Sequence, residues 1–314
     1  MKFYSTSDIR NITLVGHGGE GKTTLAEAML FVSGAIDRQG KTEDGNTVMD
    51  FDPEETKRHI SISSAVAPVE WKNTKINIVD TPGYFDFIGD ATSGAYLADS
   101  AIIVVGGLTG LTVGAEKAWD ASTKAGISKA FFVNQMDKEH VDFDRVVDSL
   151  KEKYGTKITV LQLPIGQGLN FKGIFDVIEM KGYGFDGKKV KEIDAPEDVK
   201  AKAEEIREAI IENAAENDEA LMEKFFEGEE LTKEDILQGL KVGIAEGDVV
   251  PVFLGAAAPT LGISLLLDNI VEFLPSPDKK IRIKGKTPKG EEVVYTADSK
   301  QPFAAQVYKT VTDP

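Results

Sequence analysis

The feature that most constrains the fold is a glycine-rich stretch near the N-terminus, GHGGEGKT at residues 16–23. It matches the pattern GxxxxGK[ST], in which glycines let backbone N–H groups turn inward and bind phosphate oxygens. An apolar segment at 12–15 precedes it, and apolar residues at helical spacing follow at 24–30. This context predicts a phosphate-binding loop between a strand and the positive end of a helix. Lys22 would then reach the β- and γ-phosphates, and Thr23 would ligate Mg²⁺.

A second motif, Asp80-Thr81-Pro82-Gly83, follows an apolar segment at 75–79. An aspartate at a strand's carboxyl end can hold Mg²⁺, usually through water, and the Gly83 N–H can approach a γ-phosphate closely. Between the two motifs, residues 33–64 are polar and lack apolar periodicity. We expect them to form a long loop that is functional or mobile, the alternative being a merely disordered surface loop.

A third motif, Asn134-Gln135-Met136-Asp137, follows the apolar segment 129–133. Asn134 could tie a base-binding loop to the phosphate loop. The Asp137 carboxylate could accept hydrogen bonds from N1–H and the exocyclic amine of guanine, a donor pair that adenine lacks. Alone, NxxD is more typical of a turn. Because it comes third in order, each motif following a strand, we interpret the set as a site that selects GTP over ATP.

Strands and helices alternate through residue 163, which predicts an α/β fold with a mostly parallel sheet covered by helices on both faces. The predicted core strands are 12–15, 65–71, 75–79, 101–106, 129–133, 157–163 and 249–255, and the predicted core helices are 24–30, 113–125, 141–154 and 261–274.

The alternation predicts three parts of the chain. Residues 1–164 and 250–278 form the core, and residues 165–249 form an inserted α+β subdomain with strands at 173–180 and 183–185 followed by acidic helices. Residues 279–314 comprise a linker to residue 290 and two strands, 292–296 and 303–308. Because two strands cannot bury a core, we expect a further β domain that the chain only begins.

Charge and composition exclude several classes of protein. The net charge is −16, of which 18 acidic and 6 basic side chains at 192–246 contribute −12. This balance argues against binding DNA, and any contact with RNA would need local patches. There is no run of about 18 apolar residues and no signal-peptide pattern, so we expect no membrane contact and a cytoplasmic location. With no cysteine, the chain has no disulfide and no thiolate metal site.

Taken together, these motifs resemble the GTP-binding region of translational GTPases, most closely elongation factor G, over essentially the whole chain. Other stretches that carry the resemblance are Arg10-Asn11-Ile12, Met49-Asp50, Asp86-Phe87 and Phe273-Leu274-Pro275-Ser276-Pro277. The resemblance implies a P-loop GTPase fold with an inserted subdomain and the start of a β-barrel domain. It further implies GTP or GDP with Mg²⁺ as ligands, and a ribosome-associated GTPase whose nucleotide state drives translocation or a related remodelling step. The inserted subdomain would contact the ribosomal stalk protein.

The resemblance also assigns site residues. Nucleotide contacts would come from His17, Gly18, Gly19, Glu20, Gly21, Lys22, Thr23, Thr24, Asp80, Gly83, Asn134, Gln135, Asp137, Ala256 and Ala257. Mg²⁺ would be held by Thr23, Ser61 and, through water, Asp80. Lys22, Gly83 and Tyr84 occupy the positions of the catalytic groups.

Several of these positions depart from the family pattern. Tyr84 stands where a histidine usually positions the attacking water, and a neutral phenol cannot take on the positive charge of an imidazole. The other departures are Ser61 for threonine, His59 for glycine, Gly19 for aspartate, Gln135 for lysine and Ala256 for serine. The backbone N–H groups of Ala256 and Ala257 would still meet the guanine carbonyl.

These departures suggest a divergent elongation factor G paralogue with slow intrinsic hydrolysis. His59 could supply the missing imidazole, although a solvent-facing histidine is the simpler interpretation. Three alternatives stay open: a nucleotide-gated ribosome-binding module with little hydrolysis, a ribosome-protection or release-type relative, and, least favoured, an ATPase.

Overall fold

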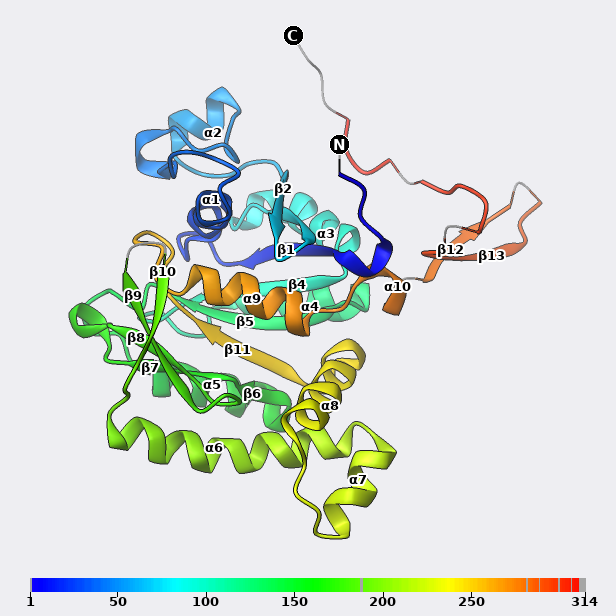
Figure 1. Ribbon diagram of the computed structural model, residues 1–314. Helices are drawn as coiled ribbons and strands as arrows, with labels where there is room; N and C mark the ends of the chain where they lie inside the picture. The colour runs from blue at the N-terminus through cyan, green and yellow to red at the C-terminus, as the bar shows by residue number, and fades with distance from the viewer. Residues whose placement is uncertain are drawn as a thin grey trace.

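The computed structural model of the chain describes residues 2–186, 189–280, 282–287, 289–298, 300–305 and 307–310. Its centre is a seven-stranded sheet in the order β2-β3-β1-β4-β5-β11-β6 (Figure 1). The strands are β1 (Ile9–Gly16), β2 (Ala65–Trp71), β3 (Thr74–Asp80), β4 (Ser100–Gly106), β5 (Ser128–Asn134), β6 (Ile158–Val160) and β11 (Val250–Leu254). Edge strand β2 runs antiparallel to β3, and every other pair is parallel. The mostly parallel α/β sheet predicted from the sequence is confirmed.

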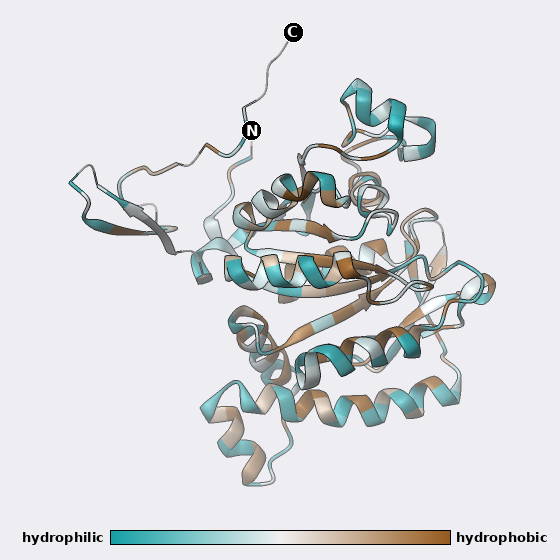
Figure 2. Cartoon of the chain, turned by 180° about the vertical axis from the view of Figure 1, so that it is seen from behind, coloured by the Kyte–Doolittle hydropathy of each residue, from teal (hydrophilic) through white to brown (hydrophobic). Residues whose placement is uncertain are grey.

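Helices cover both faces of this sheet. They are α1 (Lys22–Ser33), α3 (Ile88–Leu97), α4 (Val113–Ala125), α5 (Phe143–Tyr154) and α9 (Ile263–Phe273). Helices α1 and α9 pack together on one face, and α3 and α4 pack together on the other. Strands β4 and β5 are buried along their whole length, because both of their faces are covered. Figure 2 shows the resulting hydrophobic centre between helices with hydrophilic outer faces.

The predicted strand 157–163 is wrong in one respect, because it is two strands in two sheets. Strand β6 belongs to the large sheet, and β7 (Gln162–Ile165) opens a four-stranded antiparallel sheet with β8 (Gly173–Asp176), β9 (Lys181–Asp186) and β10 (Lys189–Ile193). Leu161 lies between them, donating its N–H to the Val252 carbonyl and accepting the N–H of Val177. The apolar run is continuous across this change of sheet, so its pattern carries no sign of the break.

The predicted strand 173–180 is also shorter than expected. It ends at Asp176, whose Oδ1 accepts the N–H groups of Ile178 (2.9 Å) and Glu179 (2.8 Å). A side chain that takes over two backbone donors in this way forms a turn. The turn directs Glu179 toward α8.

The acidic helices are α6 (Glu197–Glu216), α7 (Glu219–Phe226) and α8 (Lys233–Glu246). Helix α8 has Thr232 as its N-cap, which forms a capping box with Asp235. Helices α6 and α8 approach closely, since a Cβ at Gly239 would lie 2.2 Å from the Ala214 carbonyl oxygen.

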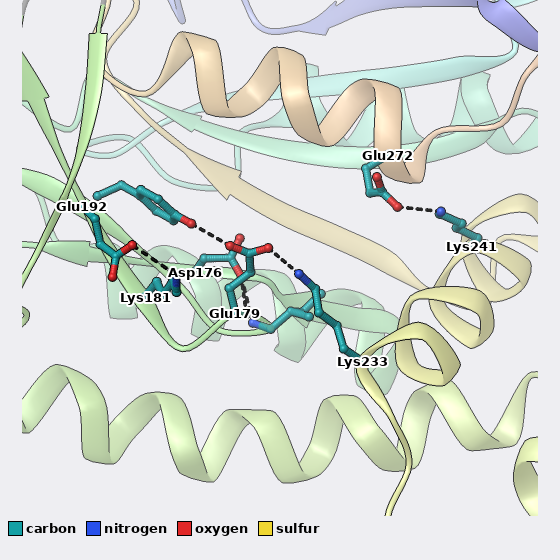
Figure 3. Close-up of polar contacts among 9 residues, drawn as sticks. Asp176, Glu179, Lys181, Glu192, Lys233, Lys241 and Glu272 are labelled. Atoms are coloured by element: carbon teal, nitrogen blue, oxygen red, sulfur yellow. Dashed lines mark hydrogen bonds and ion pairs between the residues drawn. The ribbon is translucent and has the colours of Figure 1, made fainter. Parts of the chain in front are cut away.

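Ion pairs join this part of the chain internally and to the core, as Figure 3 shows. Glu179 accepts from Lys233 of α8 and from the Tyr183 hydroxyl of β9. Lys241 of α8 pairs with Glu272 of α9. The latter pair connects an acidic helix to the large-sheet core.

The C-terminal part contains α10 (Pro277–Lys280) and an antiparallel pair, β12 (Arg282–Lys286) and β13 (Glu292–Thr296). Strand β12 lies within the predicted linker 279–290, so that prediction is wrong there. The predicted strand 303–308 is not a strand in its described residues, 303–305 and 307–308. The described residues of this region form the antiparallel pair β12–β13, in the place where the start of a β-barrel domain was expected.

The predicted long loop at 33–64 is packed and partly helical rather than loose. It contains a 3₁₀ turn, η2 (Thr42–Asp44), and a short helix, α2 (Pro53–Arg58), that begins with a capping box of Asp52 and Glu55. Two buried carboxylates hold the segment. Glu27 of α1 accepts the N–H groups of Gly40, Val48 and Met49, and Glu55 accepts those of Ile62 and Ser63.

Candidate functional site

A cavity of about 360 Å³ opens at the carboxyl ends of β1, β3 and β5, where the three motifs of the sequence converge. Ligand clefts of open α/β sheets lie at this edge. The cavity is lined by Gly18, Gly19, Gly21, Lys22, Thr23, Thr24, Thr42, Glu43, Asp50, His59, Ile60, Ser61, Gly83, Tyr84, Asn134, Gln135, Asp137, Lys138, Ala257 and Ala258. Five separate segments therefore contribute to one site.

The phosphate loop forms one wall of the cavity. Its Gly21 has φ +83°, and a Cβ there would lie 2.6 Å from the Asn134 side chain, so glycine is required. The buried Lys22 donates from Nζ to the carbonyl oxygens of Gly16 (3.1 Å) and His17 (2.8 Å). Burial lowers the pKa of Lys22 from its usual value. A bound anion would offset this lowering of the Lys22 pKa, because it would place the opposite charge beside the ammonium group.

Oxygen donors gather beside Lys22. The hydroxyls of Thr23 and Ser61 lie 2.9 Å apart, and Asp80 is buried at the end of β3 within hydrogen-bonding reach of Thr23. Asp80 Oδ1 has no hydrogen-bond partner among the residues that the structure describes. Burial raises the pKa of Asp80 to about 7, against the opposing effects of Thr23 and Lys22. The three residues predicted to hold Mg²⁺ therefore lie together.

The loop after β3 lies directly on the phosphate loop. A Cβ at Gly83 would fall 2.3 Å from Lys22 Nζ and 2.7 Å from the Gly18 nitrogen, so only glycine permits this approach. Tyr84, 45% exposed, lines the cavity next to it. Gly83 and Tyr84, which the resemblance placed among the catalytic groups, therefore both lie at the Lys22 end of the cavity.

The third motif connects the two ends of the cavity. Asn134 donates from Nδ2 to the Glu20 carbonyl (2.9 Å) and accepts the Ala257 N–H at Oδ1 (3.0 Å). Gln135 has φ +63° and donates from Nε2 to the Gly19 carbonyl (3.2 Å). Half-buried Asp137 lies on the cavity wall at this end. The tie between loops that the sequence suggested is present in the structure.

Four of the predicted site residues do not line the cavity. They are His17, Glu20, Asp80 and Ala256. The Glu20 carboxylate turns inward to accept the Thr109 hydroxyl (3.0 Å), and burial raises its pKa. Ala256 is fully buried and donates its N–H to the Leu261 carbonyl (2.9 Å), and the Ala257 N–H donates to Asn134 Oδ1 (3.0 Å). The expectation that these two N–H groups meet the guanine carbonyl is therefore corrected, because both already have a partner in this structure.

Sequence reasoning missed several residues of the site. The buried Asp50, which bonds Ser61, lines the cavity, as do Thr42, Glu43, Ile60, Lys138 and Ala258. His59 is exposed and lies at the cavity with Nδ1 bonded to the Thr42 carbonyl (2.7 Å). Two features of the sequence could have indicated that residues 34–64 are ordered and so contribute to the site. One is Glu27, a glutamate within an apolar helical stretch, and the other is the capping-box pattern at 52–55.

Comparison with known proteins agrees with this geometry. Residues 7–276 match the family described as the elongation factor Tu GTP binding domain. An elongation factor G-like protein of Thermotoga maritima is 35% identical over 306 residues, covering 98% of this chain and 44% of that protein. Elongation factor G of Ureaplasma parvum is 38% identical over 308 residues, covering 97% of this chain and 45% of that protein.

A solved structure is also similar. The crystal structure of a Thermus thermophilus protein matches with a TM-score of 0.83 and 33% identity, over 87% of this chain and 41% of that one. The chain thus spans less than half the length of these relatives. The sheet, the phosphate loop and the sequence match all agree with one family. We conclude that the chain belongs to the translational GTPases of the elongation factor Tu GTP-binding domain family.

Proposed function

We propose that the cavity binds GTP and GDP, with the phosphates at Lys22 and the base at Asp137. The observation that carries the proposal is the double hydrogen bond of Asn134, which couples the phosphate loop to the Ala257 turn. A nucleotide laid between the two would present its β- and γ-phosphates to a buried cation and the N-terminus of α1. Its guanine would present two donors to the Asp137 carboxylate.

The residues present also fit Mg²⁺. The donor set of Thr23, Ser61 and Asp80 is all oxygen, as Mg²⁺ prefers, and includes the unpartnered Oδ1 of Asp80. Among the described residues, no group of three or more His, Cys, Asp or Glu side chains could hold a metal unaided. We therefore infer that phosphate oxygens complete the ligand set. When bound, Mg²⁺ neutralises charge that develops on the β- and γ-phosphate oxygens.

We further propose that the chain hydrolyses GTP slowly. Lys22 holds the terminal phosphates, the Gly83 N–H donates to the γ-phosphate, and the Tyr84 phenol orients the attacking water. A phenol positions water by hydrogen bonding but does not gain the positive charge of an imidazole, which lowers electrostatic stabilisation of the transition state.

The wider role follows from the relatives. We propose that the protein acts on the ribosome, in translocation or a related remodelling step, with the stalk protein as a partner of the acidic insertion. We propose three domains for this role: a GTPase core at 1–164 and 250–278, the inserted acidic subdomain at 165–249, and the C-terminal part at 279–314. Strand β7 crosses the boundary between residues 164 and 165. No helix of the described residues is both long and apolar enough to span a membrane. The cytoplasmic location stays a prediction.

Nucleotide binding is tested by calorimetric titration of the intact protein with GTP, GDP and ATP in the presence of Mg²⁺. We expect both guanine nucleotides to bind and ATP to bind much more weakly. Asp137→Asn, which replaces an acceptor by an amide, should weaken GTP and strengthen xanthosine triphosphate, since xanthine presents a carbonyl where guanine presents its amine. Equal binding of ATP and GTP would remove the proposal.

A second candidate, a nucleotide-gated ribosome-binding or ribosome-protection factor, is favoured by Tyr84 at the water-positioning location. Single-turnover hydrolysis with and without ribosomes separates the two. Stimulation by ribosomes supports the GTPase. Binding without any turnover supports the gated module.

A further inference from the structure

The loop that follows β3 lies across the phosphate loop in a fixed register. Gly83 packs against Lys22 and Gly18, as the 2.3 Å and 2.7 Å approaches of a Cβ at Gly83 show. Phe85 packs its ring edge-on against His17 of the phosphate loop, with ring centroids 5.8 Å apart. Tyr84 lies between these two contacts, so the backbone on both sides of it is held.

The Tyr84 ring lies over the bare Cα of Gly18. A Cβ at Gly18 would lie 3.0 Å from Cζ, 3.1 Å from Cε2 and 3.3 Å from Cδ2 of that ring. Gly18 does not have a positive φ, whereas Gly19 and Gly21 have φ of +84° and +83°. The backbone at Gly18 would therefore accept a side chain, and it is the tyrosine ring that occupies the room.

A cation–π contact also anchors Phe85, the residue that follows Tyr84. The Lys117 ammonium of α4 lies 3.9 Å from the centroid of the Phe85 ring, which also contacts the His17 ring. Phe85 thus contacts both the phosphate loop and α4, which holds the backbone next to Tyr84, and Gly18 and Tyr84 both line the cavity.

We propose that Gly18 is a positioning residue for hydrolysis, because its missing side chain seats the Tyr84 ring and so places the phenol at the Lys22 end of the cavity. The inference rests on the proposed GTP hydrolysis. The phenol oxygen accepts a hydrogen bond from the attacking water, whose oxygen forms the new bond to the γ-phosphorus while the bond to the β–γ bridging oxygen breaks. The proton of the water leaves with inorganic phosphate, and the phenol is unchanged.

Three variants of the intact protein test the pair. Tyr84→Phe keeps the ring on Gly18 and removes the hydroxyl, and Gly18→Val keeps the hydroxyl and displaces the ring. Each should lower the single-turnover rate of GTP hydrolysis by about 10-fold to 100-fold, the range expected when a positioned group is lost or misplaced. The double variant should be no slower than the slower single variant, because both changes remove the same contact.

A matched control is Gly89→Ala in α3. Gly89 lies in the helix that follows the same loop, and a Cβ there would meet nothing within 4 Å. This variant should hydrolyse GTP at the unaltered rate.

Binding of a fluorescent GDP separates the inference from the proposed function. Variants that lose much more in the rate of GTP hydrolysis than in affinity for GDP support the Gly18–Tyr84 pair, since a general structural defect would weaken binding as much. Unaltered hydrolysis in either single variant, fully additive losses in the double variant, or binding without turnover in the unaltered protein would each overturn the inference. Absence of GDP binding by the unaltered protein would instead overturn the proposed function.

Discussion

The segment 34–64 depends on a single buried carboxylate, and replacing Glu27 by glutamine tests this dependence. One oxygen of Glu27 accepts the N–H groups of Val48 (2.6 Å) and Met49 (3.1 Å), and the other accepts that of Gly40 (3.0 Å). In Glu27→Gln the amide oxygen can serve only one of these two sides. The amino group then faces a backbone donor on the other side, where no hydrogen bond can form.

The magnitude follows from these contacts. A hydrogen bond to a charged group contributes about 1.5–3 kcal/mol, and a neutral acceptor weakens the bonds that remain. We expect the segment to lose about 3 kcal/mol of local stability, which corresponds to an increase of about 100-fold in its population of open forms. The rest of the fold should keep its stability, because Glu27 holds this segment and not the strands.

Hydrogen exchange of the backbone amides measures this opening directly. In Glu27→Gln, the amides of Gly40, Val48 and Met49 should exchange about 100-fold faster. Asp44→Asn, which removes an exposed charge from the same segment, should leave the rates unchanged. If the three amides exchange as slowly in Glu27→Gln as in the unaltered protein, the carboxylate does not hold the segment and the reasoning fails.

Three further changes test other parts of the structure. Burial raises the pKa of Asp99 from 3.8 to about 6, so the folded state binds its proton more tightly and the free energy of unfolding falls as the pH rises from about 4 to about 6. Urea denaturation at both pH values should show Asp99→Asn gaining up to about 3 kcal/mol relative to the unaltered protein over that interval, and a constant difference would contradict this. Gly83→Ala places a methyl group 2.3 Å from Lys22 Nζ and should weaken GDP binding in a fluorescence titration while circular dichroism stays unchanged. Asn134→Ala leaves two backbone groups unpaired and should lower the free energy of unfolding by about 2–4 kcal/mol, whereas an unchanged urea midpoint would show that the loop tie contributes nothing.

Gly18 and Glu27 contact two different segments beside the cavity. Gly18 contacts the loop after β3, and Glu27 holds the segment 34–64. In the proposed function, the cavity holds the phosphates, while the segment 34–64 and the loop after β3 respond to the γ-phosphate. Order–disorder changes of such segments are a common way in which GTPases report their nucleotide state. In this structure, hydrogen bonds to Glu27 and Glu55 hold the first segment, and ring contacts hold the second.

Local chemistry made much of the fold predictable. The three motifs each follow a strand at the carboxyl edge of the sheet, and helix α4 has the bounds expected from its pattern, 113–125, with Gly126 ending it in the left-handed conformation. Buried strands β4 and β5 are continuous apolar runs. A phosphate loop, a helix stop and a doubly covered strand depend on residues close together in the chain, so their patterns can be read directly.

Only the tertiary structure decided the rest. The passage of the chain from one sheet to the other at Leu161 depends on Val252 and Val177, which are distant in the sequence. The inward turn of the Glu20 carboxylate depends on Thr109, and the use of the Ala256 N–H depends on Leu261. The sequence by itself determined which chemical groups reach the carboxyl edge of the sheet, where the cavity lies. Packing between distant segments decided which of these groups face the cavity. The reason is that neither periodicity nor spacing in the sequence indicates which acceptor a buried donor will bond.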